Sequence, residues 1–192
     1  MSILDKGTIL TYTGKEFNLL WPNLDSICIE DIAHSLAMQC RFTGHSKEFY
    51  SVAQHSVYVS QLVPSVDVSN CAPSKVRLAA LLHDAAEAYA GDIASPLKAL
   101  LPNYSVIEDR IQESIYNKYI PEGVDTYSRY LIKTADLEAL AAERDCLLPA
   151  GTEWGILRGV KRGAIDILPH FSPELAEEEF LAVFEELTRA IH

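Results

Sequence analysis

The chain has 192 residues, which is typical of one domain, and its 48% hydrophobic and 22% charged residues are the composition of a globular protein. These values exclude a disordered, collagen-like or disulfide-framework class. The formal net charge of −11 argues against a non-specific nucleic-acid binder and against a cationic membrane-surface protein. We therefore treat residues 1–192 as a single domain without a nucleic-acid polymer as partner.

The cysteines and the apolar runs favour a cytoplasmic protein. Cys28, Cys40, Cys71 and Cys146 form no Cys-x-x-Cys pair, which predicts free thiols in a reducing compartment. Acidic residues interrupt the apolar stretches well before the roughly 20 residues that a membrane span needs. We expect a cytoplasmic location and no membrane partner.

The apolar pattern predicts an all-α fold with one small N-terminal β-hairpin. Two β-rich runs, 8–12 and 16–20, flank a turn at Gly14. Further along, apolar side chains recur every three or four residues, which is the period of an amphipathic helix. We predict helices over 29–40, 51–63, 75–90, 95–101, 105–119, 126–148 and 173–191.

Four glycines lie between residues 149 and 163, in a segment that also carries Arg158, Lys161 and Arg162. Such glycine density predicts a loop or lid, broken at most by a short helix. Two interpretations remain open: a segment that closes over a nucleotide, or a surface loop without a ligand.

Three ionisable side chains, His83, Asp84 and Glu87, stand among leucines and alanines in the predicted helix 75–90. That helix would place His83 and Glu87 on one face, because they are four residues apart. Buried charge costs several kcal/mol unless it is paired or bound to a metal. For an isolated His-Asp dipeptide, a packed histidine beside a solvent-facing carboxylate is the commoner arrangement, so a metal site requires further ligands.

Two further candidate ligands lie on predicted helices. His55 shares an apolar stripe with Val52 and Val59, and Asp136 follows Ala135 in a largely apolar stretch. Two imidazoles and two carboxylates suit zinc, cobalt, manganese or iron better than calcium. A site with four protein ligands keeps positions open for water and substrate, which predicts hydrolysis rather than a structural role.

The order His55, His83-Asp84, Asp136 resembles the ligand pattern of the HD-domain metal-dependent phosphohydrolases. The run from His83 to Lys98, HDAAEAYAGDIASPLK, is similar to a segment shared by bacterial 5′-deoxynucleotidases and phage dATP triphosphohydrolases. Residues 29–55 look closest to the dATP triphosphohydrolase branch. The resemblance covers roughly residues 29–140 and implies an HD-domain helical bundle that forms a homo-oligomer.

The resemblance also implies metal and catalytic roles. It assigns the metal ligands to His55, His83, Asp84 and Asp136. It matches Glu87 to the carboxylate that orients or deprotonates the attacking water, and Asp92 to an acidic residue that shares this work or binds a second metal. The cofactor is then a divalent ion (Co, Mn, Zn, Mg or Fe).

Substrate contacts follow from the same resemblance. Arg41, Lys98 and Lys133 match cationic positions that hold phosphate, and they would supply the local basic cluster that an acidic chain needs for an anionic ligand. Phe42 and Pro96 would lie near the sugar and base. Relatives often carry tryptophan after the arginine, so Phe42 leaves the base preference open.

Three functions remain open on the sequence. The leading one is a dATP or other purine deoxynucleoside triphosphate triphosphohydrolase that releases deoxynucleoside and triphosphate. The second is a 5′-deoxynucleotidase that acts on monophosphates. The third is a non-catalytic HD module that senses a nucleotide; a missing ligand or a missing Glu87 would favour it, and all of these residues are present.

Overall fold

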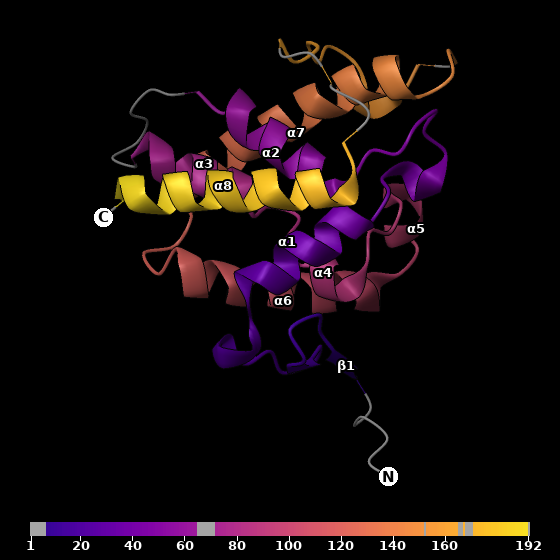
Figure 1. Ribbon diagram of the computed structural model, residues 1–192. Helices are drawn as coiled ribbons and strands as arrows, with labels where there is room; N and C mark the ends of the chain where they lie inside the picture. Colours follow the sequence, from indigo (N-terminus) through magenta and orange to yellow (C-terminus); the bar gives the residue numbers. More distant parts are fainter. Residues whose placement is uncertain (1–6, 65–71, 152, 165–166, 168–170, 192) are drawn as a thin grey trace.

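A computed structural model describes residues 7–64, 72–151, 153–164, 167 and 171–191 of the chain. These residues are mostly helical, with one two-stranded antiparallel sheet near the N-terminus (Figure 1). The predicted all-α class with a small hairpin is confirmed. The elements are β1 (Thr8–Leu10), β2 (Glu16–Asn18), α1 (Ile29–Met38), α2 (Val52–Leu62), α3 (Pro73–Leu81), α4 (Glu87–Ala90), α5 (Ser95–Lys98), α6 (Pro102–Tyr119), α7 (Thr126–Leu147) and α8 (Pro173–Ile191), with 3₁₀ turns at Leu24–Ser26, Phe42–Gly44 and Gly155–Leu157.

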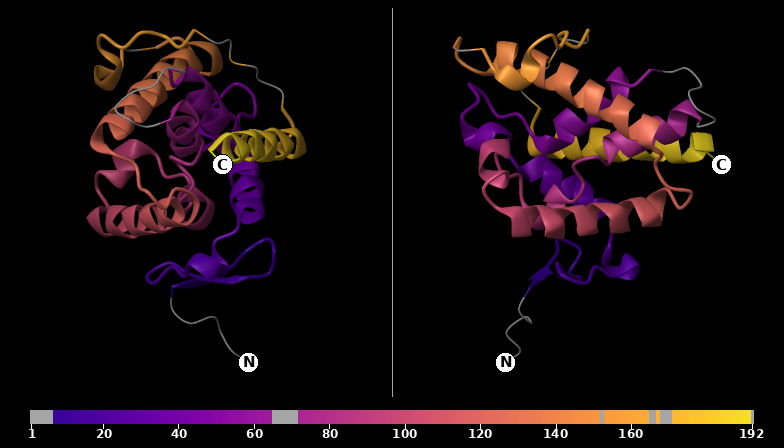
Figure 2. Two further views of the ribbon diagram at one scale, coloured as in Figure 1. Left: turned by 90° about the vertical axis from the view of Figure 1, so that its left-hand side faces the viewer. Right: turned by 180° about the vertical axis from the view of Figure 1, so that it is seen from behind.

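Helix α2 forms the centre of the molecule. It packs against α1, α3, α7 and α8, and the views in Figure 2 show α8 on one side of it and α7 on the other. A capping box starts the helix, because the Ser51 hydroxyl accepts from the Gln54 backbone while the Gln54 side chain accepts from the Ser51 backbone. Every residue from Val52 to Ser60 is buried. His55 therefore belongs to the most enclosed helix of the fold.

The prediction of one helix over 75–90 is wrong in its second half. Helix α3 ends at Leu81, and three-residue turns follow, in which the His83 amide donates to Ala80 (3.3 Å) and the Glu87 amide to Asp84 (3.0 Å). Helical structure resumes in α4 and stops at Gly91, whose positive φ of 87° suits glycine. Turns closed by hydrogen bonds between residues three apart bury side chains at nearly the same spacing as an α-helix does. The apolar pattern therefore does not distinguish such turns from a continuous α-helix.

Helices α5 and α6 differ from their predicted limits. Helix α5 ends at Lys98 instead of residue 101, and α6 starts at Pro102 instead of Ser105. Proline is tolerated in the first turn of a helix because the amide it lacks would have no partner there. Pro102 therefore opens a helix instead of only closing the previous one.

The hairpin pairs Ile9 with Phe17 and is fastened to α1 by Asp31. The Asp31 carboxylate accepts from the amide and from the hydroxyl of Thr13 at 2.7 and 2.9 Å. Phe17 is fully buried and stacks on Tyr89 of α4 with ring centroids 3.8 Å apart. These contacts hold the hairpin on the helical core.

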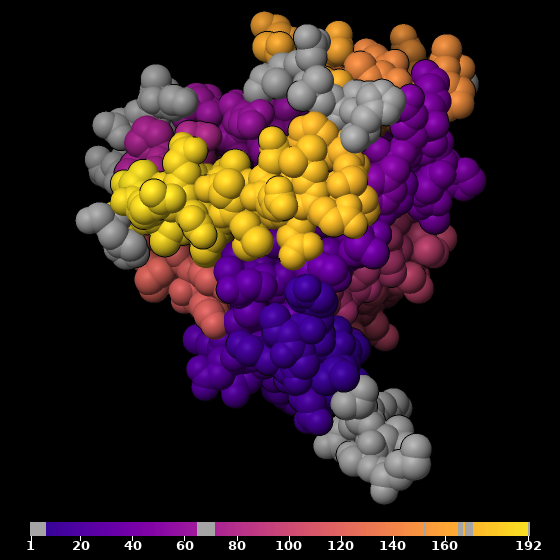
Figure 3. Space-filling view, viewed as in Figure 1, coloured from indigo at the N-terminus to yellow at the C-terminus, as the bar shows by residue number. Residues whose placement is uncertain are grey.

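Helix α8 lies along the surface, as the space-filling view shows (Figure 3). It buries Ala176, Phe180 and Leu187 against the core, while Phe184 and Ile191 are partly buried. The predicted apolar face is confirmed. Among the described residues, no helix has both the length and the apolar character that crossing a bilayer requires.

The glycine-rich segment after α7 is a loop with one 3₁₀ turn, as predicted. Gly163 fixes its far end, because its amide donates to the Glu138 carbonyl of α7 at 3.0 Å. A Cβ at this position would lie 2.5 Å from the Tyr58 hydroxyl oxygen, so only glycine fits without displacement. The loop is thus held close to α2 and α7.

Candidate metal centre

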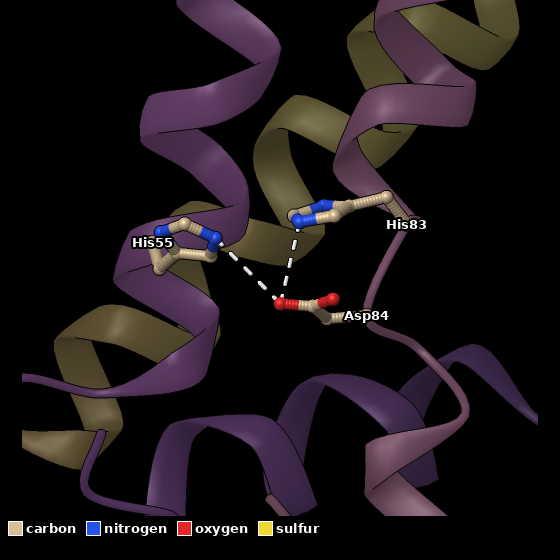
Figure 4. A group of neighbouring side chains, drawn as sticks. All are labelled: His55, His83 and Asp84. Carbon is tan, nitrogen blue, oxygen red and sulfur yellow. Dashed lines mark ion pairs between the residues drawn. The ribbon is translucent and has the colours of Figure 1, made fainter. Parts of the chain in front are cut away.

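Three side chains from two segments form a group that could hold a metal ion (Figure 4). His55 projects from α2, and His83 and Asp84 project from the turn after α3. The Nε2 atoms of His55 and His83 lie 3.6 and 3.3 Å from one Asp84 oxygen, Oδ2. The sequence analysis expected His83 on one face of a continuous helix. His83 lies instead on a turn, and this turn still directs its imidazole towards His55.

Asp136 brings a second carboxylate to this group from α7. Its Oδ1 lies 3.3 Å from His55 Nε2 and 4.0 Å from His83 Nε2. All four side chains that the resemblance assigns as ligands are thus brought together, from α2, the turn after α3, and α7.

Hydrogen bonds orient both imidazoles in the same sense. Nδ1 of His55 bonds a Glu143 oxygen at 2.6 Å, and Nδ1 of His83 bonds the Ala80 carbonyl at 2.8 Å. An acceptor at Nδ1 fixes the proton there, which leaves the Nε2 lone pair free. Both Nε2 atoms are buried and make no hydrogen bond within the described part of the chain. This is the arrangement that metal-binding histidines adopt.

The spacing of these atoms fits a shared ion. Ligands about 2.1 Å from one ion, at angles between about 90° and 109°, lie roughly 3.0–3.4 Å apart. Three of the four nitrogen to oxygen separations, 3.3, 3.3 and 3.6 Å, are close to this range, and the fourth, 4.0 Å between His83 and Asp136, corresponds to a wider angle at the ion. All four are longer than good hydrogen bonds. The residues present therefore fit a divalent ion, and imidazole with carboxylate suits zinc and the neighbouring transition metals.

Glu143 is the more deeply buried of the two site residues that the sequence analysis missed. It is fully buried in α7, and besides His55 it bonds Arg41, whose Nε and Nη2 lie 3.2 and 3.1 Å from Oε2. Burial alone would raise the pKa of Glu143, but Arg41 and His55 outweigh it and lower the pKa to about 2. Its seven-residue spacing from Asp136, two helical turns on one face, is the signal that could have found it.

The surrounding charges also act on His55 and Arg41. In the metal-free chain burial and Arg41 lower the pKa of His55, while Glu143 and Asp136 raise it, and the result is a pKa of about 9, so a metal ion that binds Nε2 would displace a proton from it. Arg41 Nη1 lies 3.7 Å from Asp84, so one guanidinium faces both the buried glutamate and a candidate ligand. Arg41 is held firmly at the edge of the centre.

Glu87 and Lys98 form a second ionic group beside the centre. Lys98 Nζ lies 2.7 Å from Glu87 Oε1 and 2.6 Å from Glu108 Oε1. Burial and the Asp84 charge raise the pKa of Glu87 to about 8, against the effect of Lys98. Its other oxygen, Oε2, is buried and has no hydrogen-bond partner among the described residues. Glu108 was not singled out by the sequence analysis.

The remaining predicted residues lie at the edge or on the surface. Asp92 is half-buried, and burial raises its pKa. Lys133 bonds Asp136 Oδ2 at 2.6 Å but its side chain is 63% exposed. Phe42 packs near Trp154 with centroids 6.4 Å apart, and Pro96 is exposed at the start of α5. The structure gathers the predicted ligands more tightly than the predicted substrate contacts.

Comparisons with known proteins give relatives of nearly full length. No protein-family model matches the chain. It is 41% identical over 181 residues to the uncharacterized protein YfdR of Escherichia coli (strain K12), which covers 94% of this chain and 95% of YfdR. It is 34% identical over 137 residues to the uncharacterized protein RCAP_rcc00048 of Rhodobacter capsulatus, covering 69% of each.

Proposed function

The chain belongs to one family with YfdR and RCAP_rcc00048, and we propose that it is a divalent-metal-dependent phosphohydrolase of deoxynucleotides. One observation carries the proposal: His55 and His83, each fixed through Nδ1, direct buried Nε2 atoms, which have no hydrogen-bond partner among the described residues, towards Asp84 and Asp136. Such a donor set supports a divalent ion, and the resemblance to HD-domain phosphohydrolases supplies the reaction class.

A divalent ion in this centre would polarise a phosphate oxygen and offset the negative charge that develops as the phosphorus to oxygen bond breaks. Glu87 is suited to orient the attacking water and accept its proton, because Oε2 is free while Lys98 fixes Oε1. Arg41, at 3.7 Å from Asp84, can reach a phosphate bound beside that carboxylate. No covalent intermediate is needed.

The resemblance favours a purine deoxynucleoside triphosphate, above all dATP, as substrate. One observation favours a monophosphate, the substrate of a 5′-deoxynucleotidase, as the second candidate. The three cations assigned to phosphate each contact carboxylates: Arg41 contacts Glu143, Lys98 contacts Glu87 and Glu108, and Lys133 contacts Asp136. Partly neutralised cations attract a triphosphate less than free ones would.

A product assay tests the proposal. The purified chain is incubated with Co²⁺, Mn²⁺, Mg²⁺ or Zn²⁺ and each deoxynucleoside mono- and triphosphate, and the products are separated by anion exchange. Deoxyadenosine with intact triphosphate from dATP identifies the triphosphohydrolase, and turnover of monophosphates alone identifies the nucleotidase. Asp84→Ala should abolish either activity, whereas His45→Ala, at an exposed histidine, should not. Absence of metal-dependent turnover would favour the non-catalytic module.

A further inference from the structure

A hollow of about 450 Å³ lies where α7 ends and the glycine-rich loop begins. Its walls come from this end of α7 with the following loop and from the segment before α2, which lie side by side in Figures 1 and 2. Its lining residues are Lys47, Arg144, Asp145, Leu148, Pro149, Ala150, Gly151, Glu153 and Trp154. The sequence analysis assigned none of them an individual role, although it left open that the glycine-rich loop closes over a nucleotide.

The hollow is lined by both apolar and polar side chains. Trp154, Leu148 and Pro149 supply aromatic and aliphatic surface, while Lys47 and Glu153 supply a donor and an acceptor. A heteroaromatic ring has the complementary form, since its faces stack on aromatic side chains and its edge makes hydrogen bonds. The volume is within the range of small-molecule sites.

Ring contacts connect this hollow to the metal centre. Trp154 lies against Phe42, and Phe42 lies under the Arg41 guanidinium at 5.4 Å from its ring centroid. Arg41 in turn reaches Asp84 at 3.7 Å. One ligand could therefore place a phosphate beside Asp84 and extend past Phe42 towards Trp154.

The two walls of the hollow are tied to each other. The Lys47 amide donates to the Leu147 carbonyl at 2.8 Å, and Lys47 Nζ donates to the Cys146 carbonyl at 3.5 Å. Helix α7 also carries Asp136 and Glu143, so one rigid helix fixes both the metal centre and one wall of the hollow. This geometry points to a single extended site.

We propose that the hollow is the base subsite of this enzyme: it takes the heteroaromatic base of a nucleotide whose phosphate lies at the metal centre, with the base stacked on Trp154. The orientation of the ligand rests on the proposed function, but binding of a base alone does not. The test therefore begins with a nucleoside, which has no phosphate and needs no metal.

Tryptophan fluorescence gives a direct measurement. The chain has two tryptophans, and Trp21 is 75% exposed next to the hairpin, at the far end of the molecule from the loop (Figure 1). Trp21→Phe leaves Trp154 as the single reporter. Titration of this variant with deoxyadenosine and with thymidine, without metal, should quench its emission saturably with at least one of them. Quenching by neither would overturn the proposal.

Equilibrium dialysis with the quenching nucleoside supplies the matched comparison. Trp154→Ala should weaken binding at least about tenfold, because stacking on an aromatic side chain accounts for a factor of this size. Trp154→Phe should restore most of the affinity, and Trp21→Ala should bind as the unmodified chain does. Equal affinity of Trp154→Ala and Trp21→Ala would overturn the subsite.

Kinetics distinguish this proposal from the proposed function. In an active enzyme, Trp154→Ala should raise KM for the nucleotide about tenfold, and it should raise KM for the matching base-free sugar, 2-deoxyribose 5-triphosphate for a triphosphohydrolase or 2-deoxyribose 5-phosphate for a nucleotidase, by a smaller factor. Equal increases would overturn the base subsite and leave the hydrolase intact. Nucleoside binding at Trp154 without hydrolysis of any nucleotide would instead reject the hydrolase and retain the base site.

Discussion

His55 and His83 present the same nitrogen to the same centre, but the chain orients them in different ways. His55 is in the middle of α2, and a buried carboxylate from α7, Glu143, holds its Nδ1. His83 is on a turn, and the backbone carbonyl of Ala80, three residues earlier, holds its Nδ1. A side chain can be mutated, whereas a carbonyl stays with the backbone. His55 is therefore the candidate ligand whose orientation depends on a distant residue.

The largest expected effect comes from removing either imidazole. His55→Ala and His83→Ala should each lower the hydrolysis rate by about 10³-fold or more, because a catalytic ion contributes several kcal/mol to the barrier. Metal content by elemental analysis and the turnover rate are the two measurements. His45→Ala is the control, and a His83→Ala protein that keeps its metal and its rate would contradict the assigned centre.

The comparison becomes sharper with Glu143→Gln. Loss of the carboxylate should weaken metal binding about 10- to 100-fold, because the Glu143 carboxylate bonds Nδ1 of His55 and thereby orients its Nε2 towards the centre. It should also lower the free energy of unfolding by about 3–5 kcal/mol, because Arg41 loses its buried partner. Denaturant titration and metal titration measure the two effects. Glu138→Gln on the same helix should shift neither, and equal behaviour of the two variants would refute the role of Glu143.

A smaller effect is expected at Glu108, which positions Lys98 against Glu87. Glu108→Gln should lower kcat about tenfold with little change in KM, because a charge-assisted hydrogen bond contributes about 1.5–3 kcal/mol. Asp109→Asn, at the exposed neighbouring position, is the matched control. Glu108→Asp should recover part of the rate, whereas an unchanged rate in Glu108→Gln would show that Lys98 alone is enough to hold Glu87.

The smallest effect is expected at Lys133. Its ion pair with Asp136 joins an exposed side chain to a half-buried one, and such pairs contribute about 0–1 kcal/mol. Lys133→Met should therefore change the apparent metal affinity by less than about fivefold. The KM for the nucleotide is measured with the same variant. A rise in this KM well above about fivefold would show instead that Lys133 contacts phosphate, as the resemblance implies.

The sequence predicted the long helices well where local signals and burial agree. Helix α2 starts after the Ser51 cap and α7 starts at its predicted residue, Thr126, after the Asp125 cap, because both combine an N-capping side chain with a sustained apolar period. The turn at His83 was missed since Leu82, Ala85 and Ala86 are buried in either conformation. Local spacing alone could not show that the helix breaks there.

The sequence predicted the candidate metal ligands of the site but not the residues that orient the side chains around it. His55, His83, Asp84 and Asp136 carry a recognisable order, which the structure brings together. Glu108 stands on a helix face where a glutamate is most often solvated, and Glu143 shares a buried face with Asp136, but neither position shows its partner, which lies 88 residues away in sequence for Glu143 and 10 for Glu108. Such pairings depend on tertiary packing, which no local pattern contains.

The contact of Gly163 with α7 makes the glycine-rich loop a short tether. With one end continuous with α7 at Leu148 and the other bonded at Glu138, about 15 residues separate the two attachment points, so the closed loop keeps Trp154 within reach of Phe42. The loop thus gives the Trp154 indole a high effective concentration near the Phe42 ring, as a linker does for a tethered ligand. A base that enters the proposed subsite would therefore meet Trp154 at a small further entropic cost.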